Sequence, residues 1–318
     1  MAGHEFRAAS RSRILLALAL ILVAVTVVST YIASVDYASQ LADYNAYRDA
    51  ATANGLDRIA PSPLAPLSLL RGAMEYLEII GAVIAIALGY LSVSRERANR
   101  TLALLRSRPL TPTEHATGSL LGAVAVFAVL VGATAVTAVV CVGTIGHDWL
   151  SLGQLGQLSL AYVAAVLYLL AFFALGAIAT SRSNVAVNGL MIALGIWLIV
   201  VLVLPQIGDT MDADNQIPGG LFKALGLNHD GEVTILTHFA TYERIRTWTE
   251  EASLAKHFER FAFAMSDVKE RYRPLGFVSL LNVVRNDIGW LLAYAALLTA
   301  GLRRTYRSRT PITRGTSS

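Results

Sequence analysis

Five long apolar stretches constrain the fold of this chain more than any other feature of its sequence. A helix that crosses a hydrocarbon core of about 30 Å needs roughly 20 apolar residues. The stretches that meet this demand lie at residues 14–34, 76–94, 118–142, 158–180 and 185–204. Charged residues make up only 15% of the chain, well below the roughly 25% of an ordinary soluble domain. The sequence therefore predicts an all-α, polytopic membrane protein.

A sixth apolar stretch ends at Leu302 and is shorter than the others. Its uninterrupted part starts at Ile288, and about 15 residues of helix cover only about 22 Å at 1.5 Å per residue. We therefore expect this span to begin near Val283 and to cover residues 283–302. Arg285 and Asp287 would then lie at the outer membrane interface, where charged side chains can stay hydrated.

The distribution of basic residues predicts the orientation of the six spans, because cytoplasmic segments of membrane proteins carry an excess of Arg and Lys. The segments 1–13, 95–117, 181–184 and 303–318 together hold 14 arginines and 3 acidic residues. The alternating segments 35–78, 143–157 and 205–287 hold 12 basic and 19 acidic residues. We therefore expect a multi-pass protein of the cytoplasmic membrane with both termini in the cytoplasm. Its arginine-rich tail is better explained by anionic lipid headgroups than by nucleic acid.

We interpret residues 1–318 as one membrane domain with two substantial outer loops, 35–75 and 205–282. The first loop contains a proline-rich stretch that must be extended or turned. In the second loop, residues 237–273 lack Gly and Pro and carry apolar residues at mixed three- and four-residue spacing, which predicts one or two amphipathic helices. The apolar positions of this pattern are Ile245, Trp248, Ala252, Ala255, His257 and Phe258. Neither loop can be closed by an internal disulfide, because Cys141 is the single cysteine.

The sequence carries no signature of catalytic or energy-converting chemistry. The interiors of the first five spans contain no ionisable residue, whereas proton relays and ion pathways require them. Glu75 and Glu78 lie at the outer edge of the second span, where we expect both to be hydrated. There is no GxxxxGK[ST] motif to hold ATP, and the histidines show no metal-ligand spacing. We therefore expect no catalytic residue, metal or cofactor site in this chain.

The cytoplasmic segment between the second and third spans, residues 94–118, is predicted to form a helical elbow at the membrane surface. Residues 101–108 can form a short helix with Leu102 and Leu105 on one side, and Pro109 ends it. Residues 111–114 read Thr-Pro-Thr-Glu, a capping-box pattern with proline at the first helical position. The third helix should therefore begin about a turn before it enters the bilayer.

At this elbow the chain resembles the permease subunits of ABC transporters of the type-2 exporter family. After its second span that family carries a glutamate, a Gly-Thr-Leu motif, a Leu-Leu pair, a proline and a Gly-Lys entering the third span. The residues that fit this pattern are Glu96, Thr101, Leu102, Leu105, Pro109, Leu110, Thr111 and Gly118. Arg100, Pro112 and Ser119 replace the family's glycine, arginine and lysine. The order of spans, with a long loop before the last, is most similar to the branch that includes the permeases of nitrous-oxide-reductase maturation.

The resemblance implies a half-transporter that exports a substrate with energy supplied by a partner. Two permease subunits, expected to be identical, would pair in the membrane, and two separate ABC ATPase subunits would bind ATP and magnesium below them. The elbow would be the coupling helix. Glu96, Thr101, Leu102, Leu105 and Pro109 would then contact the ATPase or support the contact. A protein outside the membrane is a further candidate partner for the outer loops.

Two other classes of function are compatible with the same sequence features. A six-span protein with a basic loop and a capping box could be a membrane scaffold that transports nothing. A membrane-embedded enzyme is less well supported, because the first five spans lack ionisable residues. A neighbouring gene for an ATPase with Walker motifs would favour the transporter over both alternatives.

Overall fold

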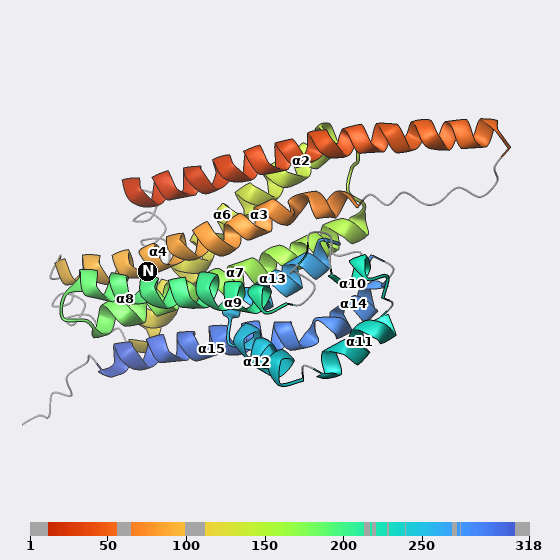
Figure 1. The fold of residues 1–318 in the computed structure, drawn as a ribbon. Helices are drawn as coiled ribbons and strands as arrows, with labels where there is room; N and C mark the ends of the chain where they lie inside the picture. The colour runs from red at the N-terminus through yellow and green to blue at the C-terminus, as the bar shows by residue number, and fades with distance from the viewer. Residues whose placement is uncertain are drawn as a thin grey trace, which may run out of the picture.

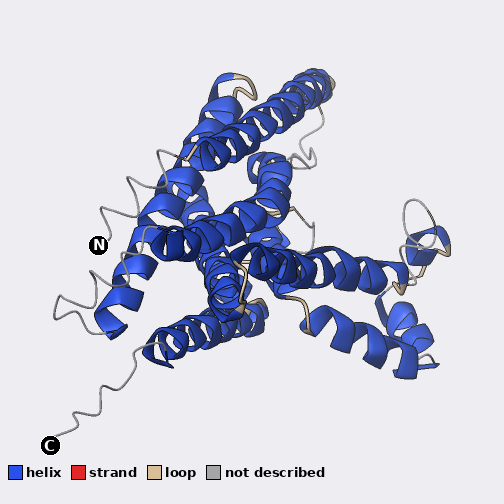
Figure 2. Ribbon diagram, turned by 90° about the vertical axis from the view of Figure 1, so that its left-hand side faces the viewer, coloured by secondary structure: helices blue, strands red, loops and turns tan. Residues whose placement is uncertain are grey.

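The computed structural model describes residues 12–55, 65–98, 112–212, 217, 221–227, 229–238, 240–268, 272–273 and 275–308. This part of the chain is helical and contains no strand (Figure 2), which confirms the predicted all-α fold. The longer helices are α2 (Arg13–Ala53), α4 (Ala82–Ala98), α6 (Pro112–Thr144), α7 (Leu152–Arg182), α8 (Ala186–Trp197) and α15 (Arg285–Ser308). The shorter ones are η1 (Pro66–Leu70), α3 (Arg71–Tyr76), η2 (Leu77–Gly81), η3 (Leu198–Val203), α9 (Leu204–Thr210), α10 (Leu221–Ala224), α11 (His229–His238), α12 (Ala240–Glu251), α13 (Leu254–Met265) and α14 (Phe277–Val283).

Five helical runs are long and apolar enough to cross a membrane. They are Arg13–Ala53, Pro66–Arg97, Thr113–Thr144, Leu152–Arg182 and Ala186–Thr210. Each run contains one of the five predicted apolar stretches except for Val185, which directly precedes the fifth run, and the runs lie alongside one another as a bundle (Figure 1). The second run joins η1, α3, η2 and α4, and the fifth joins α8, η3 and α9. The chain is therefore built as a multi-pass membrane protein.

The predicted sixth span corresponds to α15, which is 24 residues long but less apolar than the other five runs. This helix packs against α6 and α7 and runs beside α7 through the bundle (Figure 1). The start of α2 and the end of α15 lie at the same end of the bundle, whereas α10, α11, α12 and α14 lie at the other end (Figure 1). We refer to these two ends as the elbow end and the cap end.

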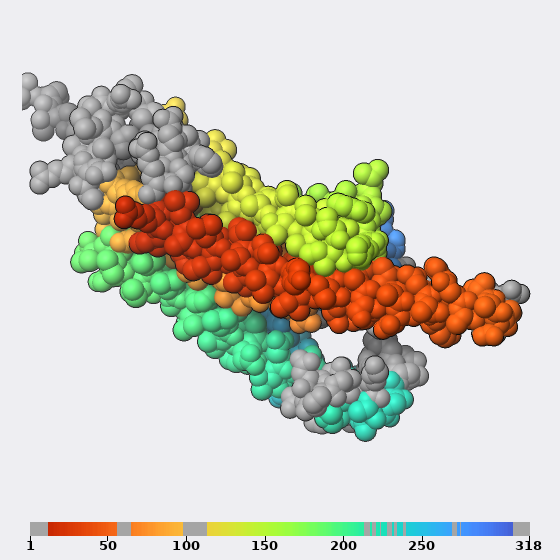
Figure 3. Space-filling model, turned by 90° about the horizontal axis from the view of Figure 1, so that it is seen from above, coloured from red at the N-terminus to blue at the C-terminus, as the bar shows by residue number. Residues whose placement is uncertain are grey.

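The first outer loop is much shorter than predicted, because helices extend into it from both sides. Residues 13–53 contain neither Gly nor Pro, and α2 continues through all 41 of them. It stops before Gly55, which adopts a φ of 74° that other residues rarely reach. The next run begins at Pro66, the favoured proline position at a helix start. The last turns of α2 project beyond the other spans (Figures 1 and 3).

Helix α7 is the centre of the bundle and contacts α4, α6, α8, α13 and α15. Its contact with α4 is unusually close, because Gly89 of α4 and Gly176 of α7 each face backbone atoms of the other helix. A Cβ atom at residue 89 would lie 2.3 Å from the carbonyl oxygen of Phe173, and one at residue 176 would lie 2.6 Å from that of Ile86. Small residues permit such close approach between membrane helices. The α4–α7 pair therefore forms the rigid centre of the fold.

Candidate functional site

The predicted coupling residues lie at or within the segment 99–111, between α4 and α6. Of these residues, the structure describes Glu96, in the last turn of α4. Thr101, Leu102, Leu105 and Pro109 lie outside the described residues, as does the predicted short elbow helix. The structure describes the residues on either side of the segment, where α4 is helical to Ala98 and α6 is helical from Pro112. The candidate site is therefore the base of the elbow.

Glu96 connects the two ends of the segment to each other. Its carboxylate lies 2.8 Å from Nε2 of His115 in the first turn of α6, and the two side chains are only 15% and 17% exposed. The ring of His115 lies 4.8 Å from the ring of Tyr306 on α15, centroid to centroid. One turn deeper, the hydroxyl groups of Ser92 and Ser119 share a buried hydrogen bond of 3.3 Å between α4 and α6. Glu96 thus supports the elbow from the inside of the bundle.

Arg97, the next residue, connects the elbow to a different pair of helices. Its Nη2 donates to the carbonyl oxygens of Thr180 and Ser181 at 2.8 and 2.9 Å, in the last turn of α7. Its Nη1 donates to those of Ser183 and Asn184 at 2.9 and 3.5 Å, in the turn that leads to α8. The last carbonyls of a helix have no partner within the helix and carry partial negative charge, so a guanidinium suits them. Arg97 therefore caps α7.

These contacts join the ends of neighbouring helices to one another. Glu96 and Arg97 are both engaged in contacts between helices. Among the residues that the structure describes, no group of three or more His, Cys, Asp or Glu side chains could hold a metal ion. The residues at the base of the segment 99–111 are thus attached to α6, to the end of α7 and to the turn before α8, and His115 of α6 contacts α15.

A second polar region lies at the cap end, where α13 is inserted between two membrane-spanning runs. Each run contains one π-helical segment, and each segment offers a carbonyl oxygen to a hydroxyl group. The Ser253 hydroxyl, which caps the start of α13, donates to the carbonyl of Val200 in η3 at 2.6 Å. The Tyr168 hydroxyl of α7 donates to the carbonyl of Glu78 in η2 at 2.9 Å. The two π-helical segments therefore lie where these spans contact α13.

Lys256 fixes α13 to the end of the fifth run. Its Nζ lies 2.8 Å from Asp209 of α9 and 2.9 Å from Glu259 of α13, and its side chain is only 9% exposed. Burial lowers the pKa of Lys256, but the two carboxylates outweigh that effect and raise its pKa above the ordinary value. Lys256 is therefore a charged residue held in a buried ion-pair cluster. Breaking such a pair by removing one partner leaves a buried charge uncompensated.

The two helices in residues 240–265 confirm the prediction of amphipathic helices, but the predicted apolar face is wrong for α12. Ala255, His257 and Phe258 of α13 are buried as expected, whereas Ile245 and Trp248 of α12 are 54% and 72% exposed. The inward face of α12 is charged instead. Its Arg246 pairs with Asp212, Glu243 and Glu250, and Arg260 of α13 also pairs with Glu250. The inward face of α12 is therefore the one that carries these ion pairs.

The expectation that Glu78 is hydrated is also wrong. The second run begins at Pro66, so Glu78 lies three turns inside a helix and not at its edge. Helix α13 packs against η2, which carries Glu78, and Glu78 is only 8% exposed. Lys256, Glu259, Asp209 and Glu75 all lie near enough to act electrostatically on its carboxyl group. The sequence did not indicate that Glu78 is buried, because the helix that covers it, α13, lies almost 180 positions further along the chain.

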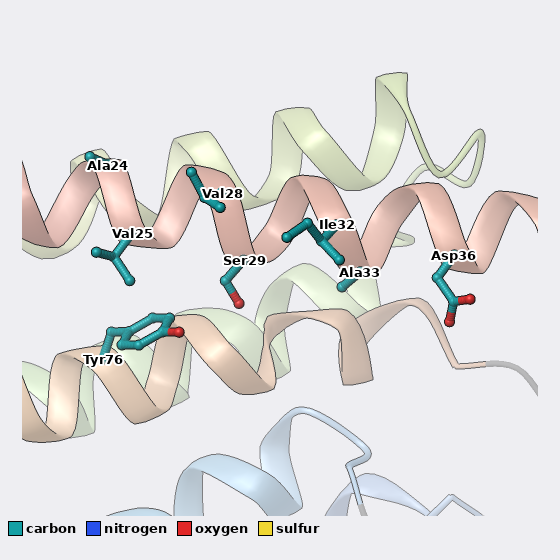
Figure 4. A pocket seen from close by; sticks show the side chains of 8 residues that line it. All are labelled: Ala24, Val25, Val28, Ser29, Ile32, Ala33, Asp36 and Tyr76. Carbon is teal, nitrogen blue, oxygen red and sulfur yellow. The ribbon is translucent and has the colours of Figure 1, made fainter.

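The surface has a groove between α2 and α3 that the sequence did not predict. It has a volume of about 640 Å³. Its lining consists of Ala24, Val25, Val28, Ser29, Ile32, Ala33, Asp36 and Tyr76. Figure 4 shows Val25 and Ser29 of α2 pointing towards the helix that carries Tyr76, with Asp36 at the far end of the row. The groove is apolar along most of its length.

The described part of the chain is an all-helical, multi-pass membrane protein in which the helices on either side of the segment 99–111 are joined to neighbouring helices. The chain belongs to the ABC-2 transporter family, since the family model described as an ABC-2 family transporter protein matches residues 1–300. The match covers all five spans and most of α15, and it agrees with the resemblance at residues 96–118. A search among curated proteins finds no match.

Proposed function

We propose that this chain is the permease subunit of an ATP-driven exporter in the cytoplasmic membrane. Membership of the ABC-2 family supports this function, because permeases of that family generally pair with an ATPase subunit. Two copies of the chain would form the membrane unit, and two copies of a separate ABC ATPase would bind ATP and magnesium. The branch of nitrous-oxide-reductase maturation permeases is the part of the family that the order of spans favours.

The braced base of the segment 99–111 is the observation that carries this proposal. A segment that receives force from a partner must be attached stiffly to the helices that it moves. Here the base of the segment is attached through Glu96 to His115 of α6, which contacts α15, and through Arg97 to the end of α7 and the turn before α8. Leu102 and Leu105 would enter a groove on the ATPase, with burial of each leucine contributing roughly 1.5–3 kcal/mol. Glu96 would support the elbow without touching the ATPase.

The proposal includes six spans with both termini in the cytoplasm. α15 supplies the sixth span, because it runs beside α7 along the bundle. The elbow end of the bundle carries the arginine-rich segments, and such segments stay on the cytoplasmic side. The acidic cap end would then face outward, and the arginines after Leu302 would lie against anionic lipid headgroups. An extracytoplasmic protein could bind only at the cap end.

Co-purification tests the proposed function directly. The affinity-tagged chain would be isolated from its own cells in mild detergent, and bound proteins would be identified by mass spectrometry. We expect an ABC ATPase with Walker motifs, and ATP hydrolysis by the reconstituted complex at a rate different from that of the ATPase alone. Isolation of the folded chain without any ABC ATPase would favour the membrane scaffold instead.

A further inference from the structure

Helix α12 turns its ionic face towards the protein and an apolar face away from it. Arg246 on the inner side pairs with three carboxylates, whereas Ile245 and Trp248, which are neighbours on one face of the helix, are largely exposed. Arg244 lies beside Trp248, four residues before it, and is also exposed. It makes no hydrogen bond or ion pair with any residue that the structure describes. A helix beside water buries its apolar face, so this reversed arrangement suits a helix whose outer face meets lipid.

The helix lies along the flank of the membrane spans rather than beyond them (Figure 1). Gly208 of α9, inside the fifth run, faces it so closely that a Cβ atom there would lie 2.7 Å from a side-chain carbon of α12. Just after α12, the carbonyl of Ala252 accepts a hydrogen bond from Tyr294 of α15, and Ser253 donates to the carbonyl of Val200.

The position of Val200 gives the depth that the end of α12 reaches. Val200 lies ten residues before the end of the fifth run, which is about 15 Å along a helix. That distance is half of a hydrocarbon core of about 30 Å. The start of α12 follows α11, which lies at the cap end (Figure 1). Helix α12 therefore descends from the cap end through the depth of one lipid leaflet.

The order of side chains on the outer face of α12 matches the order of groups in a phospholipid. Arg244 lies nearer the start of the helix, at the level of the headgroups, and a guanidinium binds phosphate well. Trp248 lies one turn deeper, and tryptophan is enriched near the membrane surface because its ring is apolar and its indole N–H can donate a hydrogen bond. The helices that α12 touches, α9 and α15, also expose large apolar side chains, Ile207 and Leu292. Helix α12 thus has lipid-facing spans as its neighbours.

We propose that the outer face of α12 binds a phospholipid of the leaflet at the cap end. Ile245 and Trp248 contact its acyl chains, and Arg244 binds its phosphate. The ion pairs of Arg246 hold α12 in the rotation that presents this face to the bilayer. The contact requires a bilayer but neither an ATPase nor a transported substrate, so it stands apart from the proposed function.

Fluorescence quenching tests this contact, because the chain contains only four tryptophans. The variant W149F/W197F/W290F keeps Trp248 alone and would be reconstituted in phosphatidylcholine vesicles. Its emission would be measured with brominated phosphatidylcholine, which quenches from within the bilayer, and with iodide, which quenches from water. The matched control is Y47W in a chain whose four tryptophans are replaced by phenylalanine. Tyr47 is 60% exposed, and the end of α2 that carries it projects beyond the other spans (Figure 1).

We expect brominated lipid to lower the emission of Trp248 several-fold and iodide to have little effect, with the reverse result for Y47W. If the triple variant does not fold, the difference between the parent and W248F gives the same signal. Quenching of Trp248 by iodide alone would overturn the proposal, because α12 would then face water. Protection from both quenchers would overturn it as well, because a second copy or another protein would then cover this face.

The headgroup contact has its own test at residue 244. With the four native tryptophans replaced by phenylalanine, R244W should be quenched more by lipid brominated near the headgroup than by lipid brominated further down the chain. Trp248 should respond more strongly than R244W to the deeper bromine. Quenching of R244W by iodide without any quenching by lipid would refute the phosphate contact.

Discussion

Replacement of Gly176 by Ala tests the close packing at the centre of the bundle. The added Cβ would lie 2.6 Å from the carbonyl oxygen of Ile86 and 3.0 Å from its Cα, whereas nonbonded heavy atoms prefer about 3.5–4.0 Å. Both neighbours are backbone atoms, so α4 and α7 must move apart. Such overpacking typically costs about 1–3 kcal/mol, and the better helix propensity of alanine returns up to about 1 kcal/mol. We therefore expect the free energy of unfolding to fall by about 1–2 kcal/mol.

Gly195 provides the matched control, because it lies in α8 and a Cβ atom there would meet nothing within 4 Å. The same Gly→Ala change should therefore be neutral or stabilising by up to about 1 kcal/mol. Unfolding of both variants would be followed by circular dichroism in mixed micelles with increasing denaturing detergent. If G176A unfolds at the same or higher detergent fraction than G195A, the α4–α7 approach is not as close as the structure shows.

The remaining predictions concern topology, the ATPase contact and the cap end. In a C141A background, Y47C should react with an impermeant thiol reagent in intact cells, whereas R304C should react only after permeabilisation. Labelling of R304C in intact cells would refute the cytoplasmic C-terminus. L102D and L105D should each reduce ATPase capture at least tenfold, since a carboxylate must then be desolvated. If the variants insert and pair normally but capture the ATPase at the parent level, the elbow is not the coupling element. In hydrogen exchange, amides of α13 should be strongly protected and those of the exposed face of α12 less so, whereas uniform fast exchange would show that the cap end is not ordered.

One residue of the candidate site, Glu96, followed from a local sequence motif. The Thr-Pro-Thr-Glu pattern predicted a helix from Pro112, and α6 is helical from that residue, the first that the structure describes after the segment 99–111. Glu96 was identified from a motif, and the structure assigns it a bond to His115. Arg97, His115 and Tyr306 were missed. No local pattern distinguishes Arg97 from its arginine neighbours, since its acceptors lie more than 80 residues away.

Sequence alone determined the five apolar spans, the helical character of residues 240–265 and the charge difference between the two sides. These properties depend on the solvent and on neighbouring residues in the sequence. A span in lipid must be a long apolar helix, and a segment without Gly or Pro readily becomes helical. Only the tertiary structure decided which face of α12 turns inward, because Arg246 there meets Asp212 and Glu250 while Ile245 and Trp248 stay exposed. It also decided that Glu78 is buried and that Arg97 caps α7. Each of these depends on partners brought together by packing of helices far apart in the chain.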